Sequence, residues 1–316
     1  MSNAARTGSA QPAILERLAA GPISWGVCEV PGWGIQLPPE RVLSEMRSLG
    51  IVATEAGPDG YLGYDTELTR ALLESHGLEL VGGFLPVVLH DPAQLDASLA
   101  KVRRTASLFT ALGARFINSA AVVDEGWSAR IELTDAQWDH LLAVLPLLDQ
   151  AAAEHGVVHV LHPHWRTVVE REEDVKRVLD GSNVGICLDT GHLALGGSDP
   201  LEIARSFADR VAHVHLKDVD NAVAARLRSG ELDLVSAVKA GIFQPLGAGD
   251  IPVDEVVLSL EQAGYTGWYV LEQDTAIVDA VPPPGQGPID DVRRSVEFLQ
   301  AIAAGTAPIV SAAEGR

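Results

Sequence analysis

The chain contains little positive charge, and this limits the partners that it can bind. Its 316 residues include 23 Lys and Arg against 43 Asp and Glu, which gives a formal net charge of −20. Such an acidic surface repels polyanions such as nucleic acids unless a basic patch intervenes. The arginine pairs at 103–104 and 293–294 fall within helical patterns and form no such patch. We therefore expect no nucleic-acid partner.

Cysteine and long apolar runs are also scarce. The two cysteines, Cys28 and Cys187, do not make a disulfide framework and suit a reducing compartment. We interpret both as packed residues rather than nucleophiles. The polar start of the chain lacks the apolar core of a signal peptide, and no run approaches the ~18 apolar residues of a membrane-spanning helix. We expect a cytoplasmic protein that has no membrane partner.

What the sequence does contain is a repeated alternation of short apolar runs and helical patterns. The runs predict buried strands at 22–27, 51–57, 78–84, 114–120, 156–162, 183–189, 210–216 and 267–273. Helix starts stand between them, such as Asp91-Pro92, Asp199-Pro200 and the capping box of Thr134 with Gln137. This alternation predicts an α/β protein with a single (β/α)8 TIM barrel. An open doubly wound sheet is the alternative.

The domain boundaries and two local features follow from the same patterns. We expect one barrel over residues 19–304, with flexible tails at 1–18 and 305–316. Pro146 stands inside a helical pattern and predicts a kink or two helical pieces. Residues 218–266 are longer than one barrel connection requires, and we expect 218–251 to cover the functional site. The glycine-rich stretch PLGAGDIP lacks the Lys-Ser/Thr of a phosphate-binding loop and predicts a structured loop.

Polar residues gather at the carboxyl ends of the predicted strands, where the catalytic groups of a TIM barrel lie. The set comprises Trp25, Glu55, Asn118, His162, His164, Asp189, His192, His215, Lys217 and Glu272. Trp25 is interpreted as partly core and partly pocket wall. For Glu55 and Asn118, a substrate contact and a structural hydrogen bond remain equally open. The opposite strand ends show no comparable collection.

Four consecutive strands end in a potential metal ligand, namely His162, Asp189, His215 and Glu272. Adjacent strands lie ~4.8 Å apart, so four neighbouring ends can converge on one ion. Imidazole and carboxylate ligands together suit Mn, Co, Fe or Zn better than Ca. Each residue alone also has an ordinary structural interpretation, for example Asp189 as a turn residue and His215 as a hydrogen-bonded core histidine. The convergence predicts one divalent metal ion.

The stretch LHPHWRT (161–167) places two histidines at the end of one strand. Side chains at positions i and i+2 of a strand point to the same face. His162 and His164 are therefore expected to face one place, where an imidazole can transfer protons near neutral pH.

Several motifs resemble a known family when they are taken in order: LHPHWRTVVE, CLDTGHL, VHLKD, SAVKAGIFQPLGAGDI and GWYVLEQD. They are similar to the sugar phosphate isomerase/epimerase superfamily with the xylose-isomerase-like TIM barrel, and most of all to its inosose dehydratases. The resemblance covers roughly residues 20–300. It implies metal ligation by Asp189, His215 and Glu272, with His162 at a strand-five position where the superfamily's isomerases and epimerases have Glu. His192 corresponds to a histidine that contacts substrate hydroxyls, and Lys217 to a polar residue beside the substrate.

The activity implied by the resemblance is metal-assisted elimination of water from a cyclic polyhydroxy ketone in inositol catabolism. For 2-keto-myo-inositol the product is a trihydroxycyclohexanedione. The candidate base is Glu272 or His164, and the candidate acid is Lys217 or His192. The expected partner is thus a small polyol or sugar ketone, and the sequence leaves homo-oligomer formation open.

Three other functions are weighed against this lyase. A metal-dependent ketose isomerase or epimerase on the same barrel shares the enolate chemistry and is the main alternative. A metal-dependent DNA-repair endonuclease is disfavoured by the acidic charge. A non-catalytic sugar-binding barrel predicts a missing ligand, whereas all four ligand positions carry competent residues.

Overall fold

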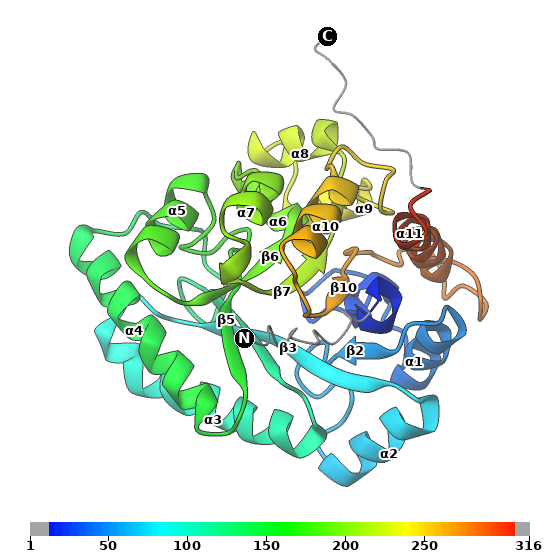
Figure 1. Ribbon diagram of the computed structural model, residues 1–316, viewed down its shortest axis with the longest axis horizontal. Helices are drawn as coiled ribbons and strands as arrows, with labels where there is room; N and C mark the ends of the chain where they lie inside the picture. Colours follow the sequence, from blue (N-terminus) through cyan, green and yellow to red (C-terminus); the bar gives the residue numbers. More distant parts are fainter. Residues whose placement is uncertain (1–12, 307–316) are drawn as a thin grey trace, which may run out of the picture.

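The computed structural model describes residues 13–306 and contains a closed barrel of parallel strands (Figure 1). The strand order around the barrel is β1-β10-β7-β6-β5-β4-β3-β2. The strands are β1 (Leu18–Ala20), β2 (Ala53–Glu55), β3 (Glu79–Val87), β4 (Phe116–Ala121), β5 (Val158–Leu161), β6 (Gly185–Asp189), β7 (Val211–Leu216) and β10 (Tyr269–Leu271). The single TIM barrel predicted from the alternation is confirmed, and the doubly wound alternative is excluded because the sheet closes.

Helices form a ring outside the strands (Figure 1). They are α1 (Pro39–Ser48), α2 (Thr66–His76), α3 (Leu95–Leu112), α4 (Asp135–Ala153), α5 (Glu172–Gly181), α6 (Thr190–Gly196), α7 (Pro200–Ser206), α8 (Asn221–Arg228), α9 (Leu234–Lys239), α10 (Val253–Gln262) and α11 (Pro288–Ala303). Short 3₁₀ turns add η1 (Ile14–Arg17), η2 (Pro22–Trp25), η3 (Pro92–Gln94) and η4 (Ala208–Arg210). Among the helices that the structure describes, none is long and apolar enough to cross a membrane.

The punctuation of the sequence explains several helix ends. The expected capping box is present at the start of α4, where the Thr134 side chain accepts the Gln137 N–H. Asp91 caps η3, which leads directly into α3. Gly77 ends α2 in the left-handed region with φ 64°. The expected division at Pro146 does not occur, since α4 continues through it as one helix.

The first strand requires a correction. The apolar run 22–27 was expected to be a strand, but β1 precedes it and residues Pro22–Trp25 form η2. Pro22 has no N–H to give to a strand ladder, and it starts the 3₁₀ turn after Gly21. Tails were expected at 1–18 and 305–316. Of these, residues 1–12 and 307–316 lie outside the part of the chain that the structure describes. Residues 14–18 are built into the barrel as η1 and the start of β1.

The long connection after β7 forms a small substructure of its own. Its strands β8 (Asp218–Val219) and β9 (Phe243–Gln244) pair antiparallel, with α8 and α9 between them. The Asp218 carboxylate accepts the backbone N–H groups of Val219, Gly247, Gly249 and Ile251 at 2.8–3.0 Å. A Cβ on Gly249 would clash with Asp218 Oδ1, so only glycine fits there. The PLGAGDIP stretch is thus a structured loop built around a buried carboxylate.

Candidate metal centre and active site

The four predicted metal ligands come from adjacent strand ends. His162 directly follows β5, Asp189 ends β6, His215 is the penultimate residue of β7, and Glu272 directly follows β10. Asp189 also caps α6, because its Oδ1 accepts the His192 N–H at 2.7 Å. Its second oxygen, Oδ2, is left facing the neighbouring strands. The ordinary capping role and the predicted ligand role therefore belong to different oxygens of one carboxylate.

These side chains converge on a space beside Asp189 Oδ2. The distance from this oxygen is 3.4 Å to His162 Nε2 and 3.6 Å to His215 Nδ1. His215 Nδ1 in turn lies 2.9 Å from Glu272 Oε2. Ligand atoms of Asp189, His215 and Glu272 all lie within 4.8 Å of one another. Neighbouring strand ends have brought the predicted set together.

Several buried polar atoms of this centre form no hydrogen bonds with one another. Within residues 13–306, Asp189 Oδ2 and His162 Nε2 are buried without a hydrogen-bond partner, and His215 Nδ1 makes no aligned hydrogen bond although it lies 2.9 Å from Glu272 Oε2. Buried polar atoms are normally paired, so a group of unpaired ones requires an explanation. A divalent cation supplies one, because carboxylate oxygens and imidazole nitrogens are its ligands. The residues present therefore fit a metal ion.

Glu272 differs from the other three residues in its exposure. Its side chain is 13% exposed, whereas those of His162, Asp189 and His215 are 0–1% exposed. Burial disfavours the charged carboxylate, but His215 and Lys217 outweigh that effect and lower the pKa of Glu272. It is thus an ionised carboxylate at the open side of the centre.

Lys217 is buried in the same cluster, which is unusual for a lysine. Its Nζ lies 2.6 Å from Asp274 Oδ1, 3.1 Å from Glu272 Oε2 and 3.3 Å from His192 Nε2. Phe243, from the connection after β7, covers it with its ring centroid 5.0 Å from Nζ. Burial alone would lower the pKa of Lys217, but the three carboxylates of Asp189, Asp274 and Glu272 raise it well above the ordinary value. The ammonium stays charged.

His164 lies against His192 rather than against the carboxylates. The two ring centroids are 3.8 Å apart. His164 Nδ1 lies 2.8 Å from the Trp165 carbonyl oxygen, so Nδ1 carries the hydrogen and Nε2 is the free lone pair. Burial, with His162 and Lys217 nearby, lowers the pKa of His164 to about 3. Both members of the predicted His162–His164 pair thus line one site, as the ring centroid distance of 5.3 Å shows.

An aromatic wall, formed by Phe84 and Trp127, adjoins His164. The Phe84 and Trp127 rings stack with centroids 5.9 Å apart, and the Trp127 and His164 centroids are 5.6 Å apart. Trp127 (φ 55°) and Arg166 (φ 66°) are the non-glycine residues with positive φ in the described part of the chain. They are bonded to each other, Arg166 Nη2 donating to the Trp127 carbonyl at 3.1 Å. Strained residues of this kind cluster at ligand sites.

The three expected substrate contacts Trp25, Glu55 and Asn118 lie deeper. Trp25 is fully buried, and its indole N–H donates to Glu45 at 2.9 Å. Trp25 therefore packs between η2 and α1. Glu55 and Asn118 are bonded to each other at 2.7 Å inside the barrel. The structure brings the last two together beneath His215, whereas Trp25 contacts a helix outside the strands.

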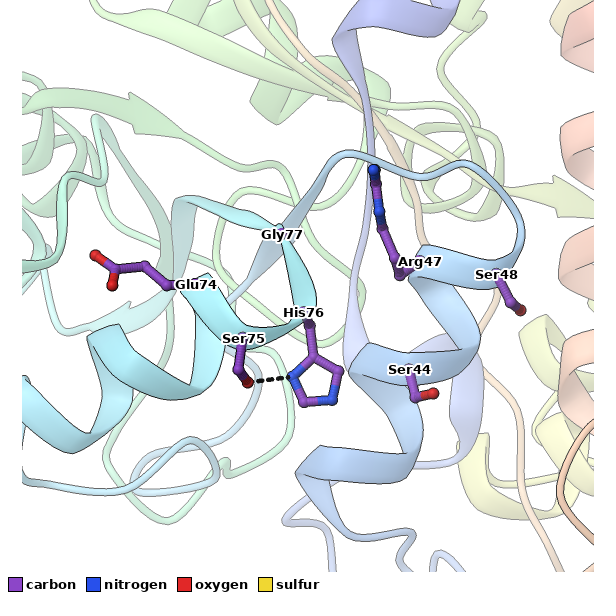
Figure 2. Close-up of a pocket in the computed structure, with 7 residues that line it drawn as sticks. All are labelled: Ser44, Arg47, Ser48, Glu74, Ser75, His76 and Gly77. Carbon is purple, nitrogen blue, oxygen red and sulfur yellow. Dashed lines mark hydrogen bonds between the residues drawn. The ribbon is translucent and has the colours of Figure 1, made fainter.

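A surface hollow between α1 and α2 carries none of the predicted site residues (Figure 2). Arg47 and His76 project into it from the ends of the two helices, and Ser75 Oγ lies 3.1 Å from His76 Nδ1. The carboxyl ends of barrel helices lie at the opposite end from the carboxyl ends of the strands. This hollow is therefore separate from the metal centre.

Several residues of the site were not predicted from the sequence, although for some of them the spacing in the sequence indicated a place there. Cys187 and Asp274 stand two positions from Asp189 and Glu272, the spacing at which strand residues share a face. Cys187 indeed groups with His162 and His215, although burial raises the pKa of its thiol to about 11. Phe84, Trp127 and Phe243 had no signal, since they reach the site from separate loops or strands.

Comparisons with known proteins agree with the barrel fold. The family described as xylose isomerase-like TIM barrel matches residues 42–302. An inosose dehydratase of Geobacillus kaustophilus (strain HTA426) is 34% identical over 278 residues, which are 83% of this chain and 89% of that protein. The rhizopine catabolism protein MocC of Rhizobium meliloti is 33% identical over 267 residues, 82% of this chain and 81% of that protein.

Solved structures share the fold. The crystal structure of the IOLI protein with a bound zinc atom superposes with a TM-score of 0.65 at 14% identity, and covers 92% of this chain and 99% of that one. A D-allulose 3-epimerase of Methylomonas sp. gives a TM-score of 0.65 at 17% identity, with 92% and 98% coverage. At such identities the likeness concerns the barrel alone.

Proposed function

Because this chain belongs to the xylose isomerase-like TIM barrel family, we propose that it is a lyase that dehydrates a cyclic polyhydroxy ketone with the help of a divalent metal. The proposed substrate is 2-keto-myo-inositol and the product a trihydroxycyclohexanedione. Relatives named inosose dehydratase support this choice. The observation that carries it is the pair formed by Glu272 and Lys217, which places a proton acceptor 3.1 Å from a proton donor beside the metal centre.

Asp189, His215 and Glu272 would hold the metal together with His162, whose Nε2 lies 3.4 Å from Asp189 Oδ2. Their mixture of oxygen and nitrogen donors suits Mn, Co, Fe or Zn, and the zinc in the IOLI protein supports zinc as one of these candidates. When bound, the metal supplies Lewis-acid stabilisation of negative charge on the ketone oxygen. The remaining chemistry belongs to the side chains.

The elimination needs one base and one acid. Glu272 is the carboxylate at the open side of the centre, and we assign it removal of the proton α to the carbonyl. Lys217 has only hydrogens to donate, and we assign it protonation of the departing β-hydroxyl, which leaves as water. Asp274, 2.6 Å from Lys217 Nζ, holds the ammonium in place. His164 and His192 then bind substrate hydroxyls.

The aromatic wall of Phe84 and Trp127 supports a cyclic substrate. A six-membered ring whose hydroxyls are mostly equatorial exposes apolar C–H faces above and below the ring. Aromatic rings pack well against such a face, while the hydroxyls point sideways to polar partners. The histidines at the edge of the wall, such as His164, suit those hydroxyls.

The histidine at position 162 favours dehydration over epimerisation. An epimerase removes a proton from one face of a carbon and returns a proton to the other face. A histidine that uses its lone pair on a metal is a poor base, so Glu272 alone serves as a strong acceptor. Once the enolate forms, expulsion of the β-hydroxyl with a proton from Lys217 is the productive path.

A product assay with defined metal content tests the proposal. The protein is stripped with a chelator, reloaded with Mn, Co, Fe or Zn, and given 2-keto-myo-inositol. We expect ultraviolet absorbance of the dione and the mass loss of one water, both only in reloaded samples. A panel of free ketoses is the comparison. Faster epimerisation of a ketose than dehydration of any inosose would refute the proposal and favour the epimerase alternative.

A further inference from the structure

We propose that Glu55 is a positioning residue of the metal centre, whose carboxylate holds the His215 ring in the tautomer that presents Nδ1 to the metal. Glu55 therefore acts on the metal through His215, and not on the substrate as the sequence pattern had left open. The inference relies on the proposed function only for the presence of a metal at this site. It does not depend on the substrate or the reaction.

Three hydrogen bonds meet at one oxygen of Glu55. Its Oε1 lies 2.7 Å from Asn118 Nδ2, 2.8 Å from His213 Nε2 and 3.1 Å from His215 Nε2. The donors come from β4 and β7, whereas Glu55 ends β2. Neither strand is a neighbour of β2 in the barrel, so the carboxylate links strands across the interior.

The chemistry of these groups fixes the tautomer. An ionised carboxylate can only accept, so the hydrogen of the His215 ring must be on Nε2. An imidazole that ligates a metal is neutral and has one N–H, so a hydrogen held on Nε2 by Glu55 leaves the Nδ1 lone pair for the metal. That nitrogen faces the predicted ligands, 2.9 Å from Glu272 Oε2 and 3.6 Å from Asp189 Oδ2. Metal-binding histidines commonly donate their other N–H to a carboxylate in this way.

The backbone of β2 changes register at this residue. Thr54 aligns with Leu80 of β3, but Glu55 aligns with Gly82, so one residue of β3 is skipped between Thr54 and Glu55. Such irregularities occur next to active sites and re-aim a side chain. Glu55 is only 2% exposed. Burial of a charged carboxylate costs free energy unless hydrogen bonds and opposite charges compensate for it. The three donors at Oε1 provide such compensation for Glu55.

Metal affinity measured without substrate tests the inference. Glu55→Gln keeps the size of the side chain but removes the charge that selects three donors. Co²⁺ is titrated by its visible absorption, in competition with a chelator, for the unsubstituted protein and the variant. We expect the variant to bind Co²⁺ about 10–100-fold more weakly, as is typical for groups that orient a ligand.

The matched control is Glu45→Gln. Glu45 is another buried glutamate, and its carboxylate accepts the Trp25 N–H at 2.9 Å and the Gly285 N–H at 2.9 Å, away from the metal ligands. We expect it to lower the melting temperature while Co²⁺ affinity stays within about twofold. Equal affinities in the two variants would overturn the inference. Weakened substrate binding by Glu55→Gln with unchanged Co²⁺ affinity would instead make Glu55 a substrate contact.

A second measurement needs no variant and applies even if Glu55→Gln fails to fold. Long-range ¹H–¹⁵N correlation spectra of the zinc-loaded protein report which nitrogen of the His215 ring carries hydrogen. We expect Nε2–H for His215, and an Nδ1–H tautomer would refute the inference, as would a protein that binds no Co²⁺. A protein that binds Co²⁺ as expected but dehydrates no inosose would refute the proposed function alone.

Discussion

Two buried aspartates near the strand ends show the difference between a structural and a functional carboxylate. Asp218, in the connection after β7, accepts four backbone N–H groups at 2.8–3.0 Å. Asp189, at the end of β6, uses Oδ1 to cap α6, while its Oδ2 has no hydrogen-bond partner within the described chain. Both are 0% exposed. Burial is therefore equal, and only the partners differ.

The completeness of hydrogen bonding, rather than burial, distinguishes the Asp189 carboxylate from that of Asp218. Burial disfavours the charge at both positions. Neutral N–H groups oppose this at Asp218, yet the pKa there remains raised. At Asp189 the charge of Lys217 outweighs burial and holds the pKa well below its usual range. The Asp218 carboxylate organises a loop, and the Asp189 carboxylate has one oxygen that we propose binds the metal.

The largest expected effect comes from Asp189→Asn. The amide keeps the shape but loses the charge that a metal requires, so metal content and dehydration rate should fall together by more than about a hundredfold, beyond the loss typical of groups that only orient a ligand. Metal analysis and the dione assay measure the two quantities. Full metal occupancy with normal turnover would show that Asp189 is not a ligand.

The same substitution at Asp218 should act on stability instead. The amide side chain would have a single acceptor oxygen for four N–H groups, so we expect Asp218→Asn to lower the free energy of unfolding by about 2–4 kcal/mol. Thermal unfolding measures this. Metal affinity below the transition should stay within about twofold. A large loss of metal from a folded Asp218→Asn protein would contradict the division between the two aspartates.

A smaller effect on product identity is expected from His162→Glu. The new carboxylate restores a possible proton acceptor on strand five, so some metal should remain while the ratio of epimerisation to dehydration rises about tenfold, equal to ~1.4 kcal/mol between the two barriers. Both products are measured from one reaction mixture by mass spectrometry and chromatography. An unchanged ratio in a metal-loaded variant would mean that His162 does not decide between the two reactions.

The smallest effect is expected from the aromatic wall. Trp127→Ala removes a stacking surface worth about 0.5–1.5 kcal/mol, so KM should rise up to about tenfold while metal content stays constant. Trp127→Phe should recover most of the affinity. Trp138→Phe is the control, because Trp138 belongs to α4 in the outer ring of helices and its ring lies 5.0 Å from Arg177 Cζ. Unchanged KM in Trp127→Ala would remove the aromatic wall from the substrate site.

The sequence was sufficient to predict the barrel and the convergence of the candidate metal ligands. Alternating strand and helix patterns have periods that depend only on local backbone geometry, and the strand ends of a barrel meet at one rim by topology. The close approach of Asp189, His215 and Glu272 follows from these two facts. The place of His162 among these side chains was predictable as well, since His162 stands at the end of an apolar strand.

Tertiary structure alone decided which oxygen or nitrogen each residue presents and to what. Glu55 stood at a strand end in the sequence, but a register shift in β2 and three donors from across the barrel made it a partner of His215. Trp127 and Phe243 reach the site from separate connections whose length allows many paths. β1 was misplaced because its short Leu-Ala-Ala run becomes a strand only through pairing with β2 and β10. Local pattern fixes periodicity, whereas pairing across the barrel fixes which atoms face one another.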